Sequence, residues 1–116
     1  MNTTELKVSE NTYELKLTTR GVVKLENAIK QNPISLFVTE NGGNRIPTVT
    51  EVGIVLYYAL QPNHPEVKNM DAVYDIIDKF VEEEGTFNDL VSIIVDLFQT
   101  CGIFPKVVET EDNEKN

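Results

Sequence analysis

The sequence predicts a mainly α protein with a small N-terminal β-hairpin, an α+β fold in which about four to five helices form a compact bundle. Three observations lead to this prediction. Residues 5–19 alternate between apolar and polar side chains, as strands do, whereas later segments repeat their apolar residues at helical spacing. Capping residues and helix breakers separate these later segments. With 116 residues, of which 41% are hydrophobic, we expect one core.

The N-terminal hairpin is predicted from two alternating stretches, residues 5–8 and 13–19. Residues 9–12 between them are polar and are predicted to form the turn. Because a lone two-stranded ribbon is only marginally stable, its apolar face should lie on helices. That face would carry Leu6, Val8, Tyr13, Leu15 and Leu17.

The first helix is predicted to begin after Thr18 or Thr19 and to run to about Gln31. Glu26 precedes Lys30 by four residues, which is the spacing of an ion pair on a helix surface. The predicted buried stripe is Val22, Leu25 and Ile29.

A short apolar segment, residues 34–38, follows the Asn32-Pro33 break. It is predicted to form a helical turn or two, with a short strand as the open alternative. The glycine-containing loop of residues 41–44 then leads to the central helix. This loop lacks the glycine spacing and the Lys-Ser/Thr pair of a phosphate-binding loop.

The central helix is predicted over residues 48–61, with Thr48 and Glu51 as a capping box and Pro62 as its end. It is apolar on two opposite faces. Such a helix is either packed on both sides or leaves one face for a partner. One face carries Val52, Val55, Leu56 and Ala59, and the other carries Ile54, Tyr57 and Tyr58.

The next helix is predicted over residues 70–84, capped by Asn69 or Asp71 and stopped by Gly85. Its inner face would hold Met70, Val73, Ile76, Ile77, Phe80 and Val81. Its outer face is an acidic ridge of Asp71, Asp75, Asp78 and Glu82. Residues 82–84 are all glutamates at the negative end of the helix dipole, so the last turn is expected to fray or to meet a basic partner.

The last helix is predicted to begin at Thr86 with Asp89 and to end at Gly102. Its apolar stripe would be Phe87, Leu90, Val91, Ile94, Leu97, Phe98 and Cys101, widened by Ile93 and Val95. Ile103 and Phe104 are expected to fold back onto the core. Residues 1–105 would thus form a single helical domain with an N-terminal hairpin, followed by a disordered acidic tail at residues 106–116.

The charge balance narrows the classes of partner. A net charge of −9 argues against nucleic acid and against anionic membrane surfaces, both of which attract basic patches. The single cysteine excludes an internal disulfide and fits a reducing cytoplasm. No apolar run approaches the roughly 18 residues of a membrane span. We therefore expect a soluble, intracellular protein.

Residues that could carry chemistry are few. His64 is the only histidine and lies in a proline-flanked loop, so it is predicted to be exposed or to cap a helix. Cys101 lies on an apolar stripe and is predicted to be a buried, inert thiol. The acidic residues do not match the spacing of a calcium loop. The sequence therefore predicts no catalytic residue, no metal site and no cofactor, and a protein that is not an enzyme.

Three segments carry a family resemblance when they are taken in order. They are YELKLTTRGVVKLENAI, then NPIS with ENGGNRIPTVTEVGIVLYYALQP, and then DAVYDIIDKFVEEEGTFNDLVSIIVDLFQTCGIFP. Together they resemble the tail assembly chaperones of long-tailed, siphovirus-type phages and prophages of Gram-positive bacteria, over nearly the whole chain. The chain departs from that family at Cys101-Gly102, where serine-glycine is typical, and at GIFP, which has an inserted isoleucine.

The resemblance implies a non-enzymatic role in virion assembly in the cytoplasm of the bacterial host. Such a chaperone binds the tape measure protein, keeps its apolar helices from aggregating, and recruits tail tube subunits. The alternative from another class is a small acidic helical adaptor or regulator that binds a globular host or phage protein.

The partner-binding surface is placed on residues that are too apolar for their positions on the predicted helices. For each of them, the alternative is a place in the core or in a homo-oligomer interface. They are Ile54, Tyr57, Tyr58, Ile93 and Val95.

Overall fold

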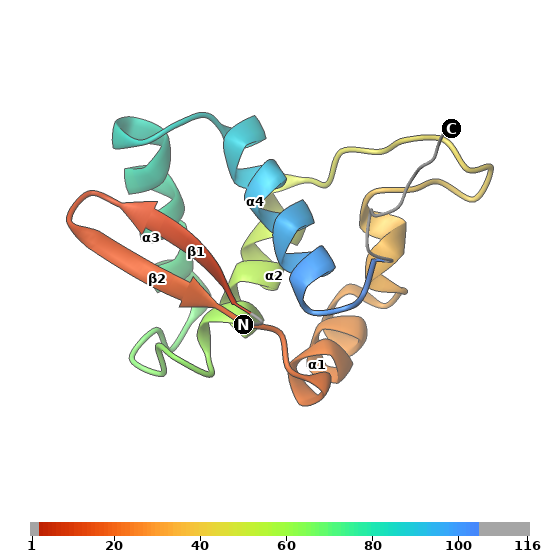
Figure 1. The fold of residues 1–116 in the computed structure, drawn as a ribbon, viewed down its shortest axis with the longest axis horizontal. Helices are drawn as coiled ribbons and strands as arrows, with labels where there is room; N and C mark the ends of the chain where they lie inside the picture. Colours follow the sequence, from red (N-terminus) through yellow and green to blue (C-terminus); the bar gives the residue numbers. More distant parts are fainter. Residues whose placement is uncertain (1–2, 105–116) are drawn as a thin grey trace, which may run out of the picture.

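The computed structural model describes residues 3–104, which form an N-terminal hairpin, four α-helices and one short 3-10 helix (Figure 1). The predicted α+β class is confirmed. The predicted tail, residues 106–116, lies outside the described residues. In chain order the elements are β1 (Thr4–Val8), β2 (Asn11–Leu15), α1 (Thr19–Ile29), η1 (Pro33–Leu36), α2 (Val49–Leu60), α3 (Met70–Glu83) and α4 (Phe87–Thr100).

The hairpin is shorter than the sequence predicted. β1 and β2 are antiparallel with Val8 opposite Asn11, so the turn is two residues long, and its first residue, Ser9, has a φ of 56°. β2 ends at Leu15 because β1 begins opposite it, at Thr4. The N–H of Lys16 instead donates to the carbonyl of Ala59, 2.9 Å away, and the chain leaves the sheet toward α2.

The hairpin lies with its apolar face on the helices, as predicted. β1 contacts α3 and α4, and β2 contacts α2. The buried hydroxyl of Thr4 donates to Asp96 on α4, at 3.0 Å. Of the five predicted inward residues, Tyr13 is half-buried and the others are buried, namely Leu6, Val8, Leu15 and Leu17.

The turn of the hairpin also holds the end of α3. The backbone N–H of Ser9 donates to the Glu84 carboxylate at 2.8 Å, and the Ser9 hydroxyl donates to Glu83. Two of the three glutamates at the end of α3 therefore bind the hairpin turn. The sequence offered fraying or a basic partner for this cluster and did not foresee this contact.

α2 is the central helix and contacts α1, α3, α4 and β2 (Figure 1). Its capping box forms as predicted, with Thr48 and Glu51 each accepting the other's backbone N–H. Its predicted inner face is fully buried. Gly53 lets α3 come close, because a Cβ there would lie only 3.2 Å from the Tyr74 ring.

α1 begins as predicted, with the Thr18 hydroxyl accepting the N–H of Gly21. It ends at Ile29, two residues before the predicted end, because Lys30 takes the left-handed conformation with a φ of 62°. Within residues 3–104, Lys30 forms no ion pair with Glu26, so that prediction is wrong. Of the predicted stripe only Leu25 is buried; Val22 and Ile29 are half-buried against the core.

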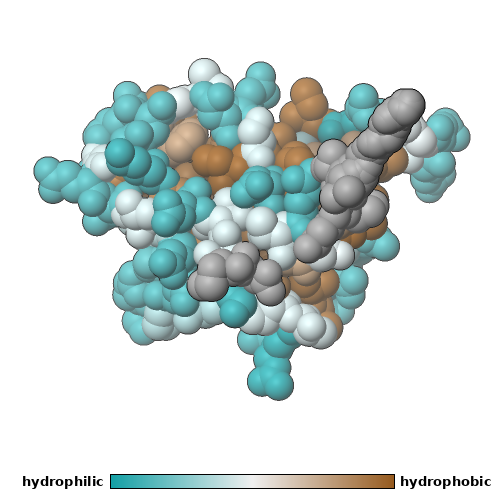
Figure 2. Space-filling view, viewed as in Figure 1, coloured by the Kyte–Doolittle hydropathy of each residue, from teal (hydrophilic) through white to brown (hydrophobic). Residues whose placement is uncertain are grey.

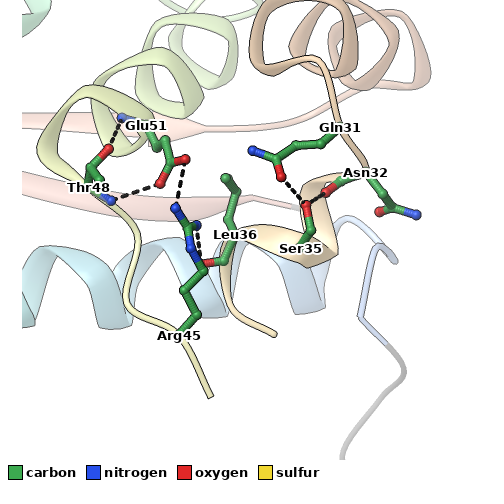
Figure 3. Close-up of polar contacts among 7 residues, drawn as sticks. All are labelled: Gln31, Asn32, Ser35, Leu36, Arg45, Thr48 and Glu51. Atoms are coloured by element: carbon green, nitrogen blue, oxygen red, sulfur yellow. Dashed lines mark hydrogen bonds and ion pairs between the residues drawn. The ribbon is translucent and has the colours of Figure 1, made fainter. Parts of the chain in front are cut away.

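The segment after α1 follows the helical prediction over a single turn, η1. The strand alternative holds only at Val38, which forms one isolated bridge with Asn44. The Ser35 hydroxyl donates toward the side chain of Gln31 and the carbonyl of Asn32, which joins η1 to the end of α1 (Figure 3).

The two C-terminal helices have the predicted caps, Asn69 for α3 and a Thr86–Asp89 capping box for α4. The prediction of Val81 on the inner face is wrong, because its side chain is 48% exposed. Gly102 ends α4 with a φ of 87°.

The chain folds back after α4, as the sequence predicted. The Phe104 ring lies edge-on against Phe98 and Phe37, at centroid distances of 5.4 and 5.6 Å. The backbone N–H groups of Ile103 and Phe104 both donate to the carbonyl of Phe98. This closes the C-terminal end of α4 against the segment that follows η1.

Candidate functional site

A pocket of about 370 Å³ lies between the start of α1 and the end of α2. It combines aromatic rings from α2 with cations from α1. Its lining residues are Thr18, Arg20, Gly21, Lys24, Tyr57, Tyr58, Gln61 and Pro62. We call it the α1–α2 pocket.

The aromatic wall of the α1–α2 pocket is Tyr57 and Tyr58. Both side chains are half-buried, and their rings meet edge to face with centroids 5.1 Å apart. The Tyr57 hydroxyl donates to the carbonyl of Lys68 at 3.3 Å. Gln61 donates its amide to the carbonyls of Tyr57 and Val67, at 3.1 and 2.9 Å. The end of α2 is thereby fixed to the loop that follows it.

The cationic wall of the α1–α2 pocket is Arg20 and Lys24, which lie one turn apart on α1. Both are exposed, and within residues 3–104 neither forms an ion pair. In a chain of net charge −9, this pocket therefore has a local positive charge.

The first turn of α1 reinforces that charge. It contains no acidic residue, whereas α2, α3 and α4 carry Glu51, Asp71 and Asp89 in their first turns. The N-terminal end of a helix is the positive end of its dipole, and at α1 no carboxylate in the first turn offsets it.

The structure brings two of the five predicted partner-binding residues together, Tyr57 and Tyr58. Ile54, Ile93 and Val95 do not line the α1–α2 pocket. All three are half-buried, and Ile54 and Ile93 pack against the core. For these two residues the packing agrees with the alternative that they complete the core.

Sequence reasoning missed the cations of the α1–α2 pocket. The available signal was the stretch TTRGVVK, in which two cations four residues apart follow a helix cap without an acidic residue. It also missed the apolar residues that the structure leaves exposed. They are Val23, Ile46, Val49, Tyr74 and Val81.

The face that carries α4 has more than one hydrophobic area in view (Figure 2). Figure 2 shows hydrophobic areas there that hydrophilic residues separate. None of the helices within residues 3–104 has the length and apolar character needed to cross a membrane.

The N-terminal end of α2 holds a polar cluster (Figure 3). Arg45 donates to the Glu51 carboxylate at 3.0 Å and to the carbonyl of Leu36 at 3.1 Å. Glu51 also accepts the N–H of Thr48 at 2.9 Å. Burial raises the pKa of Glu51, but the hydrogen bonds from Arg45 and Thr48 and the Arg45 charge outweigh it, so the pKa is lowered overall. Arg45 thus joins the loop after η1 to α2.

His64 has a structural position that the sequence did not predict. Its Nε2 accepts the backbone N–H of Glu14 at 2.9 Å, and its ring lies edge-on to Tyr13 with centroids 5.1 Å apart. The side chain is 19% exposed. The prediction of an exposed side chain is therefore wrong, since the ring joins the loop after α2 to β2. The alternative of a helix-capping residue agrees with the backbone N–H of His64, which donates to the carbonyl of Leu60 at the end of α2, at 2.7 Å.

Cys101 is half-buried rather than fully buried, and its thiol points toward the carbonyl of Phe98. Burial raises the pKa of the thiol, which disfavours the reactive thiolate near neutral pH. In the part of the chain that the structure describes, no three potential metal ligands cluster together.

A protein-family model with the description "Family of unknown function (DUF6096)" matches residues 1–115 of the chain. No curated protein and no solved structure matches it.

Proposed function

The chain belongs to the DUF6096 family, whose function is unknown, and we propose that it is a tail assembly chaperone of a long-tailed phage or prophage. In this proposal it binds the tape measure protein in the host cytoplasm and recruits tail tube subunits. It has no catalytic role and needs no cofactor. The sequence resemblance over nearly the whole chain is the starting point for this proposal.

The observation that carries the proposal is the pair of half-buried tyrosines in the α1–α2 pocket. A client rich in amphipathic helices presents apolar side chains along one face, and such side chains can anchor in an apolar pocket. Tyr57 and Tyr58 suit this task because each offers a large, rigid ring and loses little conformational freedom on binding.

Ile54, Ile93 and Val95 have a smaller part in the proposed docking surface. Val95 is half-buried and is not among the residues packed on the core. Tyr57 and Tyr58 also pack against the core, but they rank first because they line the α1–α2 pocket. Val95 ranks next, and Ile54 and Ile93 rank last. A homo-oligomer interface remains the alternative use of these three residues.

Co-expression tests the proposal. The chain should keep the tape measure protein soluble and should co-purify with it. The double variant Tyr57→Ala/Tyr58→Ala should lose most of the co-purified client while it keeps its helical circular dichroism. Tyr74→Ala is the matched control, because Tyr74 is 40% exposed and lies on α3, outside the pocket. A tape measure protein that precipitates equally with and without the chain would contradict the proposal.

The acidic adaptor is the second candidate, favoured by the ridge on α3. Asp71, Asp75, Asp78 and Glu82 are all exposed and would suit a basic surface on a globular partner. Such an adaptor would form a defined 1:1 complex that tolerates Tyr57→Ala. The position of the gene also separates the candidates, because a chaperone gene should lie between a tail tube gene and a very long tape measure gene.

A further inference from the structure

We propose that the α1–α2 pocket binds an acidic peptide segment of a partner protein. Arg20 and Lys24 would hold a carboxylate of that segment, and Tyr57 and Tyr58 would contact the apolar side chain next to it. This inference deepens the proposed function and rests on it for the role of the two tyrosines. It also specifies the chemistry of the bound segment.

The two cations of the α1–α2 pocket differ from Arg45 in how their charge is balanced. Arg45 has a carboxylate partner, whereas Arg20 and Lys24 form no ion pair within residues 3–104. Other lysines of the chain are also exposed, but these two line the same pocket as two aromatic rings. A guanidinium can bind a carboxylate through two parallel hydrogen bonds, and an ammonium one turn away adds a second charge.

The N-terminal end of α1 adds to the positive charge of the pocket. The first turn of α1 has no acidic side chain, so the positive end of its dipole faces outward without an internal carboxylate. A bound carboxylate would take the place that Glu51, Asp71 and Asp89 take on the other three helices. The helix end adds to the pocket and the cations and does not define the site alone.

The size and apolar character of the pocket limit what it can bind. A volume of about 370 Å³ holds one or two side chains rather than a whole helix. The edge-to-face tyrosine pair provides the apolar contact. The best occupant is therefore a segment in which a glutamate or aspartate is adjacent to a leucine or phenylalanine.

The proposed acidic segment has the opposite charge to the basic partners that the acidic ridge on α3 would attract. The ridge on α3 would favour basic partners, whereas the α1–α2 pocket favours acidic ones. A single client with one acidic and one basic segment would bind in one orientation. The α3 ridge would repel the acidic segment, and the cations of the α1–α2 pocket would repel the basic segment.

The test is a titration of the isotopically labelled full chain, followed by amide NMR. The probe is a synthetic, end-blocked peptide of sequence LEELLEEL, and its control has every glutamate replaced by glutamine. We expect the acidic peptide to shift the amides of residues 18–24 and 57–62 and to bind at least about fivefold more tightly than the glutamine peptide. Equal binding of the two peptides would overturn the proposal.

A pair of double variants sharpens the test. Arg20→Gln/Lys24→Gln should weaken binding of the acidic peptide about fivefold to tenfold, because each exposed charge contributes a factor of a few. Lys7→Gln/Lys79→Gln removes the same charge outside the pocket and should change the affinity by less than about twofold. All four residues are exposed, so both variants should fold. An equal loss of affinity in the two variants would show that binding depends only on the net charge of the protein, and it would contradict a specific site.

The acidic residues near the C-terminus are a competing source of carboxylates. They are Glu109, Glu111, Asp112 and Glu114. Replacing them by their amides in the full chain should leave the peptide affinity within about twofold. A gain of about fivefold or more would assign the pocket to the chain's own segment and overturn the assignment to a partner.

The peptide titration is independent of the co-expression test because it contains no tape measure protein. Peptide binding without co-purification of the tape measure protein would support the acidic-peptide site and would contradict the tape measure protein as its client. Co-purification without peptide binding would support the chaperone and remove the acidic segment.

Discussion

The cations at the two ends of α2 differ in whether they have a carboxylate partner. At the N-terminal end, Arg45 is 31% exposed and is paired with Glu51, which is 17% exposed. At the C-terminal end, Arg20 and Lys24 stand beside Tyr57 and form no ion pair in residues 3–104. The charge at the N-terminal end is paired within the protein. At the C-terminal end, positive charge and aromatic surface are available to a ligand.

The difference between the two ends distinguishes polar residues that stabilise the fold from polar residues that are available to bind a ligand. A charge withdrawn from water requires a partner, and at the N-terminal end the chain supplies one. A cation that stays in water beside an aromatic pocket costs little in the free protein and can be used by a ligand. We therefore expect changes at the first end to lower stability and changes at the second end to lower binding.

The largest effect on stability should come from Arg45→Ala. This change removes the partner of a largely buried carboxylate and the donor to the Leu36 carbonyl. We expect it to cost about 2 kcal/mol of unfolding free energy, or about 8 °C in Tm. Urea unfolding followed by circular dichroism measures it.

The matched change at the other end is Arg20→Ala, which should alter the unfolding free energy by less than about 0.5 kcal/mol. If both variants lose the same stability, the distinction between the two ends of α2 fails.

The next effect should come from Thr48→Ala, which removes the hydroxyl that accepts the N–H of Glu51 at the start of α2. Loss of such a cap costs about 1 kcal/mol. Thermal unfolding measures the change. An effect below about 0.3 kcal/mol would mean that Arg45 alone holds this end of the helix.

A smaller effect should appear as a pH dependence at Glu51. Because its pKa is lowered in the folded chain, ionised Glu51 stabilises the fold at neutral pH. This stabilisation should be fully present above pH 4.5, the ordinary pKa of a glutamate, and should be lost as the pH falls through the lowered pKa of Glu51 in the folded chain. The gap in unfolding free energy between the wild type and Glu51→Gln should therefore narrow in acid. A gap that is constant with pH would show that the ion pair contributes nothing.

The smallest effect should come from Tyr57→Phe at the open end. The hydroxyl bond to Lys68 is 3.3 Å long and exposed, so its loss should cost less than about 0.5 kcal/mol. Affinity for the acidic peptide should stay within about twofold, because the ring makes the proposed contact. A large loss of affinity, measured by the same titration, would move the recognition from the ring to the hydroxyl.

The sequence predicted what is decided locally. The Thr48–Glu51 and Thr86–Asp89 capping boxes each join two residues that are three positions apart, and the buried face of α2 follows from helical spacing. Contacts between distant residues were not predictable in this way. β2 ends at Leu15 opposite the start of β1, and the N–H of Lys16 then donates to the distant carbonyl of Ala59. His64 is half-buried because its ring binds the N–H of Glu14, fifty residues earlier in the chain.

The candidate site was predictable only in part, for the same reason. Tyr57 and Tyr58 were identifiable because they are aromatic residues on the second face of a helix. Their neighbours Arg20 and Lys24 come from another helix, and only the packing of α1 on α2 brings the four side chains together.

The most direct test of the contrast between the two ends of α2 is an amide NMR map of the labelled chain with a soluble segment of the tape measure protein. We expect shifts at residues 18–24 and 57–62, and unchanged amides at residues 45–51. Shifts concentrated at residues 45–51, with residues 57–62 unmoved, would contradict the account.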